Sequence, residues 1–404
     1  MKNKAPIKSP GVNILAINSG SSSIKFSVYR LNGHLERILD GNVDRIGLKD
    51  TRLDYNNLAT EKQGNLRLDL SDHKSVANFL IGWLEEQLDF SMISGIGHRV
   101  VFGMKHTEPE IITQKLLDEL HRIIPYDSDH LPEEIELIHV FRQRYPNLKQ
   151  VACFDTAFHS KMPRVAKLLP IPRRFDTLGI QRYGFHGLSY AYLMAEFGRV
   201  AGKKVAQGRV VLAHLGSGAS MVAVHKGKSM DTSMGFTPAG GLMMGTRSGD
   251  LDPGVAWFMM KSENLSPKQF NTLINHESGL LGISETSSDM QDLLESQTTD
   301  IRAAEAVELF CYQVKKWIGA FAAVLGGLDT LVFSGGMGEN APEIRSRICE
   351  ELGFLGIKID EKRNKTNAPV ISTDKGITAV RVIHTDEEWM IAKTVSQMLT
   401  LTKD

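Results

Sequence analysis

The sequence has no excess of charge of either sign. Lys and Arg together number 47, and Asp and Glu also number 47 among 404 residues, so the formal net charge is zero. Proteins that bind nucleic acid or an anionic membrane surface usually carry a basic excess. We therefore expect neither nucleic acid nor a membrane as a partner.

Cysteines and long hydrophobic runs are also scarce. Cys153, Cys311 and Cys349 lie far apart and show no C-x-x-C or other metal-ligand spacing, so we expect buried, reduced thiols. The longest apolar run, residues 318–328, is well short of the ~20 residues of a membrane-spanning helix. The basic segment 1–10 lacks the apolar core of a secretion signal, which favours a frayed tail on a cytoplasmic protein.

Two common nucleotide-binding motifs are missing. No G-x-x-x-x-G-K-[ST] occurs, and no G-x-G-x-x-G precedes a predicted helix, which disfavours P-loop and dinucleotide-binding folds. The chain instead has three turns of small residues at 18–23, 214–220 and 335–340. Glycines allow close approach of a ligand, and hydroxyl and N–H groups bind phosphate oxygens. The three turns predict a nucleotide held between two domains.

Two of these turns belong to an internal repeat. ILAINSGSSS at 14–23 aligns with LAHLGSGASM at 212–221, and each turn lies between two apolar strand patterns. A period of about half the chain is too long for a solenoid and indicates a duplicated domain. The length also fits two domains. A chance likeness between two hairpin turns is the alternative.

Strand and helix patterns alternate along the chain, which predicts the α/β class. Strands are expected within 93–103, 149–159 and 329–336, and helices at 75–88, 115–124 and 303–325. GGMGEN at 335–340 is expected to be a loop, with Asn340 as the N-cap of a helix at 341–352 and Pro342 in its first turn. A last helix at 385–399 is expected to begin with a capping box of Thr385 and Glu388.

Four polar residues stand at strand ends or in glycine-rich turns: Arg99, Asp155, His186 and Arg247. Taken singly, each has a structural explanation, such as a surface ion pair. Taken together they are the residue types that phosphoryl transfer uses, because arginines offset phosphate charge and carboxylates hold Mg²⁺.

The sequence resembles the acetate kinases of the acetate and butyrate kinase family, also called the acetokinase family, over nearly its whole length. The motifs that carry the resemblance are NSGSSSIKF, GHRVV, FDTAFH, YGFHGLSY, HLGSGAS, MGFTP, MGTRSGDLDPG, GGMGEN and TDEEWMIA, in the family's order. The resemblance implies the duplicated fold of actin and sugar kinases, with an interdomain cleft. The domains would be residues 1–155 plus 387–404, and residues 156–386 with the nucleotide site.

The resemblance also implies a homodimer and a reaction. ATP would phosphorylate a short carboxylate reversibly by direct in-line transfer, converting acetate to acetyl phosphate with Mg²⁺, or alternatively Mn²⁺. Nucleotide binding would close the two domains and exclude water.

Residue roles follow from the same motifs. Asp155, His186, Arg247 and Arg99 would be catalytic, and Asn18 and Glu387 would hold the metal; the capping box occupies Glu388 and so favours Glu387. The acceptor acid would contact Arg99 and an apolar pocket of Val101, Phe185 and Pro238. The nucleotide would contact Lys25, His214, Leu215, Gly216, Ser217, Gly218, Asp289, Gln291, Gly336, Met337, Gly338, Glu339 and Asn340.

Several positions depart from the family pattern, and alternatives stay open. Asp129 precedes the HLP of 130–132, Phe102 and Ser217 replace a common His and Asn, and Gln291 replaces an Arg near the nucleotide. A propionate or broad short-chain acyl kinase is the first alternative, because one methylene changes pocket preference by only ~1–3 kcal/mol. Pyrophosphate as donor, and a non-catalytic nucleotide-binding protein of the same fold, are more distant alternatives.

Overall fold

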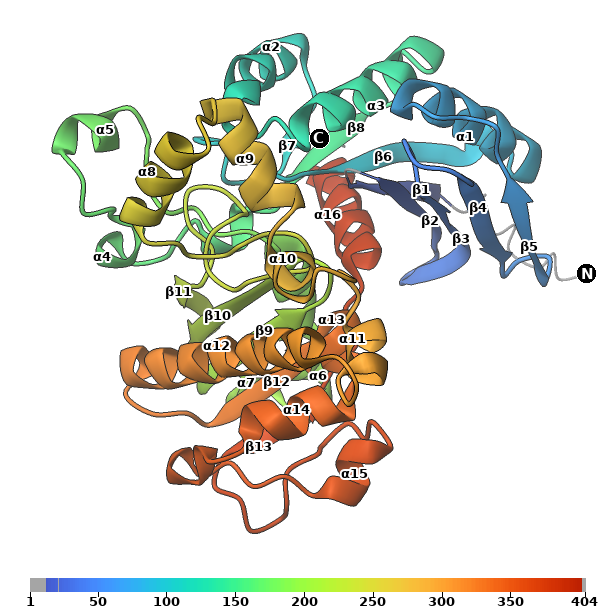
Figure 1. Ribbon diagram of the computed structural model, residues 1–404. Coiled ribbons are helices and arrows are strands. Elements are labelled where there is room, and N and C mark those ends of the chain that lie inside the picture. Colours follow the sequence, from blue (N-terminus) through green and yellow to red (C-terminus); the bar gives the residue numbers. More distant parts are fainter. Residues whose placement is uncertain (1–11, 21, 402–404) are drawn as a thin grey trace, which may run out of the picture. The chain divides into compact units, whose positions relative to one another are not determined.

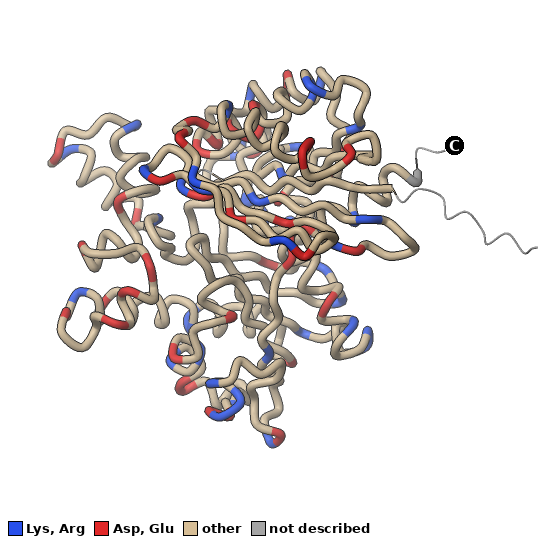
Figure 2. Tube along the Cα trace, turned by 90° about the vertical axis from the view of Figure 1, so that its right-hand side faces the viewer, with Lys and Arg blue, Asp and Glu red and all other residues tan. Residues whose placement is uncertain are grey.

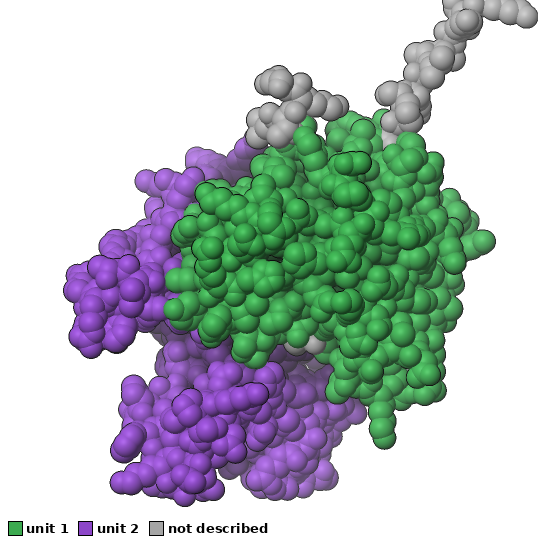
Figure 3. Space-filling view, turned by 90° about the horizontal axis from the view of Figure 1, so that it is seen from above, with its two compact units in different colours: residues 1–157, 386–404 green, residues 158–385 purple. Residues whose placement is uncertain are grey.

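The computed structural model describes residues 12–20 and 22–401 (Figure 1). The chain divides into two compact units, residues 1–157 with 386–404 and residues 158–385 (Figure 3). The N-terminal tail and Ser21 of the first predicted turn lie outside the described residues. Charged residues of both signs are interspersed along the chain (Figure 2).

Unit 1 is built on an eight-stranded sheet in the order β5-β4-β3-β2-β1-β6-β8-β7. Strands β1 to β5 pair antiparallel in succession, whereas β1, β6 and β8 are parallel. The strands are β1 Val12–Ser19, β2 Ser23–Leu31, β3 Leu35–Asp44, β4 Arg52–Asn57, β5 Lys62–Arg67, β6 Ile93–Val100, β7 Glu110–Ile111 and β8 Gln150–Phe154.

Helices cover both faces of this sheet. Helices α1 and α3 pack together and contribute Trp83 and Phe141 to a core with Phe26 of β2. Helix α16 packs on β1 and β6, where Gly97 makes room: a Cβ there would lie 2.3 Å from the Ile391 side chain. The helices are α1 His73–Gln87, α2 Gln114–Ile123, α3 Leu131–Arg144 and α16 Glu387–Leu401, with 3₁₀ turns η1 Phe90–Met92, η2 Ile124–Tyr126 and, at the unit boundary, η3 Ala157–His159.

Unit 2 has a five-stranded sheet in the order β11-β10-β9-β12-β13. Its strands are β9 Arg209–Leu215, β10 Ala219–His225, β11 Lys228–Thr232, β12 Thr330–Ser334 and β13 Ala379–Val382. Helix α12 packs on β9 and β10, and Tyr190 and Phe197 of α6 join a core with Leu212. The helices are α4 Arg164–Lys167, α5 Arg173–Thr177, α6 Gly187–Ala201, α7 Lys203–Ala206, α8 Pro253–Ser262, α9 Pro267–His276, α10 Gly279–Ser284, α11 Met290–Ser296, α12 Ile301–Leu325, α13 Gly335–Asn340, α14 Pro342–Cys349, η4 Leu352–Leu355 and α15 Glu361–Lys365.

The two sheets share one topology. In unit 1 the order β3-β2-β1-β6-β8, and in unit 2 the order β11-β10-β9-β12-β13, each consist of three antiparallel strands followed by two parallel ones. The aligned repeats form equivalent hairpins, β1–β2 and β9–β10. The predicted α/β class and duplicated fold are therefore confirmed.

Two local predictions were wrong. GGMGEN forms helix α13 and not a loop, because Gly335 at φ +77° turns the chain directly from β12 into a helix; a Cβ there would lie 2.7 Å from the Leu215 carbonyl. Asn340 ends α13, and the N-cap of α14 is Ala341, although Pro342 does occupy the first turn.

The predicted capping box of the last helix was also wrong. Asp386 caps α16, since its Oδ1 accepts the Trp389 N–H at 2.9 Å. Thr385 instead bonds Ser189 through its hydroxyl. Asp is as good an N-cap as Thr, so local sequence could not choose between the two neighbours.

Candidate functional site

An arginine–carboxylate pair lies where two parallel strands of unit 1 end. Arg99 lies near the end of β6 and Asp155 directly follows β8, so the topology brings them to the same edge of the sheet. Arg99 Nη2 is 2.7 Å, and Nε 3.1 Å, from Asp155 Oδ2. Burial is the largest influence on the pKa of Arg99 and would lower it, but the charges of Asp155, Glu387 and Glu134 together outweigh burial and raise that pKa, so the guanidinium stays charged.

Asn18 joins this pair to the first turn of α16. Its Nδ2 donates to Glu387 Oε2 at 2.8 Å and to Glu388 Oε1 at 2.9 Å, and its Oδ1 accepts from Arg99 Nη1 at 3.3 Å. Glu388 is therefore not occupied by a capping box, and both glutamates reach Asn18. Burial raises the pKa of Glu387, and the charge of Arg99 opposes that rise.

The oxygen atoms of this group fit a hard divalent cation. Asp155 is fully buried, and its Oδ1 has no hydrogen-bond partner among the described residues. In the described part of the chain, no cluster of three or more His, Cys, Asp or Glu could hold a metal by itself. Mg²⁺ commonly uses one or two carboxylates, with the remaining positions taken by water and substrate phosphates, so Asn18 and Glu387 can supply the protein ligands.

Glu134 is a site neighbour that sequence reasoning missed. This glutamate of α3 is 2% exposed, and its two carboxylate oxygens accept the Val101 N–H at 3.1 and 3.2 Å. Burial raises the pKa of Glu134 well above its usual value, with Asp127 as the next cause. Nothing in the local sequence signals this contact, because it joins residues 33 positions apart.

In unit 2, a histidine before α6 and a histidine on β9 lie together. His186 precedes α6 with a left-handed backbone (φ 58°), and its ring centroid is 4.5 Å from that of His214 on β9. His186 Nδ1 is 2.8 Å from Ser220 Oγ, and His214 Nδ1 is 2.9 Å from Ser189 Oγ. These contacts orient both rings. His186 Nε2 lies near Gly218, where an added Cβ would be 3.4 Å from that nitrogen.

Arg247 occupies the glycine-rich loop that follows β11. Its Nη1 is 3.5 Å from the Pro238 carbonyl, so two predicted site residues of unit 2 do lie together. Phe185 is buried in unit 2 and Val101 is buried in unit 1. The predicted acyl pocket thus draws residues from both units and stays a prediction.

A pocket of about 620 Å³ in unit 2 collects most of the predicted nucleotide residues. Its volume is in the range of small-molecule sites. Predicted residues in its lining are Gly216, Ser217, Asp289, Gln291, Gly336, Met337 and Asn340, and residues not predicted are Ser288, Met290, Leu294, Ala341, Pro342 and Glu343.

The remaining predicted residues of these two turns are His214, Leu215, Gly218, Gly338 and Glu339. They lie beside the pocket on β9, in the turn that follows it and on α13. Glu339 braces α13, because its Oε1 accepts the N–H groups of Gly335 and Thr385 at 2.9 and 3.1 Å.

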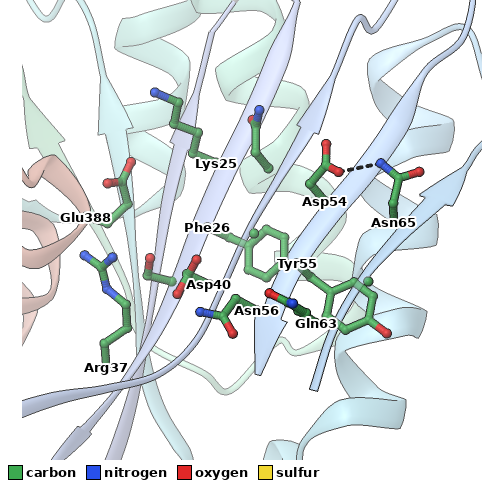
Figure 4. A pocket seen from close by; sticks show the side chains of 14 residues that line it. Lys25, Phe26, Arg37, Asp40, Asp54, Tyr55, Asn56, Gln63, Asn65 and Glu388 are labelled. Carbon is green, nitrogen blue, oxygen red and sulfur yellow. Dashed lines mark hydrogen bonds between the residues drawn. The ribbon is translucent and has the colours of Figure 1, made fainter. Parts of the chain in front are cut away.

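Lys25 lies elsewhere, in a polar groove of unit 1 (Figure 4). The strand register explains this groove. One row of paired residues across β2 to β5 faces the core: Phe26, Gly41, Tyr55 and Gly64. The residues on either side of this row point to the opposite face of the sheet and form two further rows there. The rows are Lys25, Asn42, Asp54 and Asn65, and Ser27, Asp40, Asn56 and Gln63. Arg37 and Glu388 also line the groove.

The residues that depart from the family pattern lie in both units. Gln291 Nε2 donates to Glu295 Oε1 at 3.1 Å on α11, and Phe102 is buried. Asp129 Oδ1 accepts from Ser128 at 3.3 Å.

The three cysteines are free and buried, as expected. No helix in the described ranges is both long and apolar enough to cross a membrane.

The chain is similar to known proteins both in sequence and in structure. The profile of the acetokinase family matches residues 13–393. An acetate kinase of Rhodopseudomonas palustris (strain TIE-1) is 41% identical over 395 residues, covering 95% of this chain and 97% of that protein. A propionate kinase of Salmonella typhimurium is 39% identical over 394 residues, covering 95% and 96%.

Solved structures agree with these matches. The crystal structure of a propionate kinase from Francisella tularensis has a TM-score of 0.88 at 35% identity, covering 95% of this chain and 98% of that one. That of Porphyromonas gingivalis acetate kinase has a TM-score of 0.85 at 34% identity, covering 96% and 100%.

Proposed function

The chain belongs to the acetokinase family, and from this premise we propose how its residues divide the work of a carboxylate kinase. The protein transfers a phosphoryl group reversibly between ATP and a short-chain carboxylate. We take acetate as the acceptor, giving acetyl phosphate, with propionate as the close alternative. Both names occur among relatives at nearly equal identity.

The observation that carries this proposal is the buried Arg99–Asp155 pair beside Asn18 and Glu387. Arg99 receives the acceptor carboxylate and offsets its repulsion from the phosphoryl group, while Asp155 holds the guanidinium in place. A carboxylate is already nucleophilic at neutral pH, so the step requires charge compensation and alignment and no strong general base.

The donor nucleotide occupies the unit 2 pocket between the 216–218 turn and α13. His186 and Arg247 then serve the transferred phosphoryl group: the imidazole donates a hydrogen bond to its oxygens, and the guanidinium spreads over the developing charge. The Ser220 contact supports this role, because it orients the imidazole ring of His186.

Asn18 and Glu387 would hold Mg²⁺, with Mn²⁺ able to replace it. The ion, when bound, supplies positive charge against the β- and γ-phosphate oxygens. Lys25 of β2 pairs with Asn18 of β1, so the two side chains lie on the same face of the sheet and Lys25 adds a positive charge there. The residues of this chain contribute the orientation, since Asn18 is itself fixed by three hydrogen bonds.

The experiment that tests this function traps the acyl phosphate with hydroxylamine. Acetate, propionate and butyrate are each supplied with ATP, and acetate is also supplied with pyrophosphate. We expect ATP-dependent hydroxamate with acetate, and a lower or equal kcat/KM with propionate. Product formed only with pyrophosphate would contradict ATP as the donor, and no product with any acid would contradict the carboxylate kinase.

We further propose that the protein is cytoplasmic and that it forms a homodimer; an exposed apolar surface on and next to α8 supports the homodimer. Trp257 and Phe258 are 70% and 69% exposed, and Leu251 and Val255 are 44% and 41% exposed. Such a cluster on one segment is typical of a protein interface. Phe258→Glu should shift sedimentation toward the monomer, whereas Phe354→Glu, at another exposed phenylalanine (78%), should not. Dimers that persist in both variants would place the interface elsewhere.

A further inference from the structure

A hydrogen-bonded group on the β2–β3 hairpin holds the beginning of α16. Arg37 Nη2 is 2.5 Å from Asp386 Oδ2 and 2.8 Å from the Tyr29 hydroxyl, which Arg37 Nε also reaches at 3.1 Å. The Tyr29 hydroxyl donates to Asp386 Oδ1 at 3.3 Å. The same Oδ1 caps α16 through the Trp389 N–H. Three side chains from β2, β3 and the α16 N-cap thus form one closed group.

A β-bulge creates this arrangement. Val28 pairs with Leu39, but the next residue, Tyr29, pairs with Arg37, so Ile38 is the extra residue on β3. Ile38 is buried in the core, whereas Arg37 comes to lie opposite Tyr29, on the side of the sheet that carries Asp386. Bulges occur next to active sites because they re-aim one side chain in this way.

The group is sheltered enough to act as a fixed support. Tyr29 is 1% exposed. Burial and then the charge of Asp386 raise the pKa of Tyr29, so the hydroxyl keeps the proton that it donates. The side chains of Arg37 and Asp386 are 33% and 23% exposed. Asp386 is also the first residue of unit 1 after the chain returns from unit 2.

The two residues that follow Asp386 are the glutamates that contact Asn18. We propose that Arg37 and Tyr29 are positioning residues: they fix Asp386 and thereby hold Glu387 and Glu388 beside Asn18, where the metal would bind. This inference rests on the proposed role of Asn18 and Glu387. Partners that orient metal ligands typically change metal affinity or activity 10- to 100-fold when removed.

The test compares Arg37→Met with Arg30→Met in the full-length protein. Arg30 lies next to Tyr29, and its ion-pair partner among the described residues is Glu36 of the same hairpin at 3.9 Å, so it is a matched control. Hydrogen exchange over residues 386–392 reports the first turn of α16. Mn²⁺ binding in the presence of ADP is followed by paramagnetic resonance, and ADP binding without divalent cation by calorimetry.

In Arg37→Met we expect faster exchange in the first turn of α16, Mn²⁺ binding weakened about tenfold, and unchanged metal-free ADP binding. Tyr29→Phe, which keeps the fold more safely, should show the same pattern at smaller size, and Arg37→Lys should restore part of the Mn²⁺ affinity. Arg30→Met should match the wild type. Unchanged exchange and Mn²⁺ binding in both Arg37→Met and Tyr29→Phe would overturn the proposal.

Glu387→Gln separates this inference from the proposed function. If that variant binds Mn²⁺ as the wild type does, the metal role of Glu387 fails, and with it the positioning role argued here. If Glu387→Gln loses Mn²⁺ while Arg37→Met keeps it, the proposed function stands and the positioning role alone is wrong.

Discussion

At the scale of single residues, the site depends on charges that are paired in advance. Asp155 is fully buried and bonded to Arg99, so the guanidinium has one orientation before any ligand arrives. Pre-organised donors contribute most to catalysis when they do not reorganise during the reaction. The same reasoning applies to His186, whose Nδ1 is held by Ser220.

We expect Arg247→Ala and His186→Ala each to lower kcat by ~10²–10³-fold, because each removes a donor to the transferred phosphoryl group. ADP affinity, measured by calorimetry, should change little. Arg199→Ala is the control, since Arg199 is an exposed residue of α6 that pairs with Glu196 of the same helix. Near-normal turnover in either variant would remove that residue from the mechanism.

A second prediction at this scale concerns His98 on β6. It is 2% exposed, and burial lowers its pKa to about 4, although a hydrogen bond with Gln150 acts in the opposite direction. As pH falls, His98 therefore becomes protonated near pH 6.5 in the unfolded chain but only near pH 4 in the folded protein. The contribution of His98 to the free energy of unfolding is complete above pH 6.5 and is lost as pH falls toward 4.

The expected loss is about 3 kcal/mol of unfolding free energy at most. Urea denaturation at pH 7, 6 and 5 should show a smaller decline for His98→Leu than for the wild type. The difference between the two proteins is the relevant quantity, because buried carboxyl groups such as Glu134 have raised pKa values and act in the opposite direction. Parallel declines in both proteins would contradict the prediction.

At the scale of elements, α13 is the part of the nucleotide pocket that most needs support. It is a six-residue helix with three glycines, which have low helix propensity. Arg345 of α14 is fully buried, and its Nη1 donates to the carbonyls of Gly338 and Glu339 at 2.9 and 3.0 Å. Its other donors reach Asn364 and Asn367.

Arg345→Met should lower the free energy of unfolding by ~2 kcal/mol or more, because buried carbonyls lose their donors, and should weaken ADP binding. Arg345→Lys should not restore either property, since an ammonium cannot reproduce the guanidinium fork. Arg347→Met on the same helix is the control, because Arg347 donates hydrogen bonds to the side chains of Gln297 and Glu343 and not to α13 within the described part of the chain. Equal ADP affinity in wild type and Arg345→Met would show that α13 does not need this support.

At the scale of the whole molecule, Arg99, the proposed ligand of the acceptor carboxylate, belongs to unit 1, whereas the nucleotide pocket belongs to unit 2. In-line transfer requires donor and acceptor to meet, and enclosed sites exclude competing water. We expect ATP analogue plus acetate to reduce the radius of gyration measured by small-angle scattering. Superimposable scattering profiles with and without ligands would count against closure.

Much of this organisation could be predicted from the sequence, for identifiable reasons. The turn repeat at 14–23 and 212–221 is encoded in local residue type, and the duplicated hairpins followed from it. Arg99 and Asp155 could be selected as candidates because each stands at the end of a predicted strand, whereas their contact became evident only from the parallel pairing of β6 and β8. The family motifs then supplied roles for residues whose chemistry local reasoning had left open.

What only the tertiary structure decided are contacts between distant segments. Glu134 meets Val101 from 33 positions away, Arg37 meets Asp386 from 349 positions away, and Glu388 reaches Asn18 from 370 positions away, so no local pattern could encode these contacts. The helix at GGMGEN and the Asp386 cap were misjudged for the same reason: glycine content and capping propensity are local preferences of about 1 kcal/mol. Packing against β9 and bonding to Arg37 outweigh preferences of that size, because they act through burial and charge that exist only once the chain has folded.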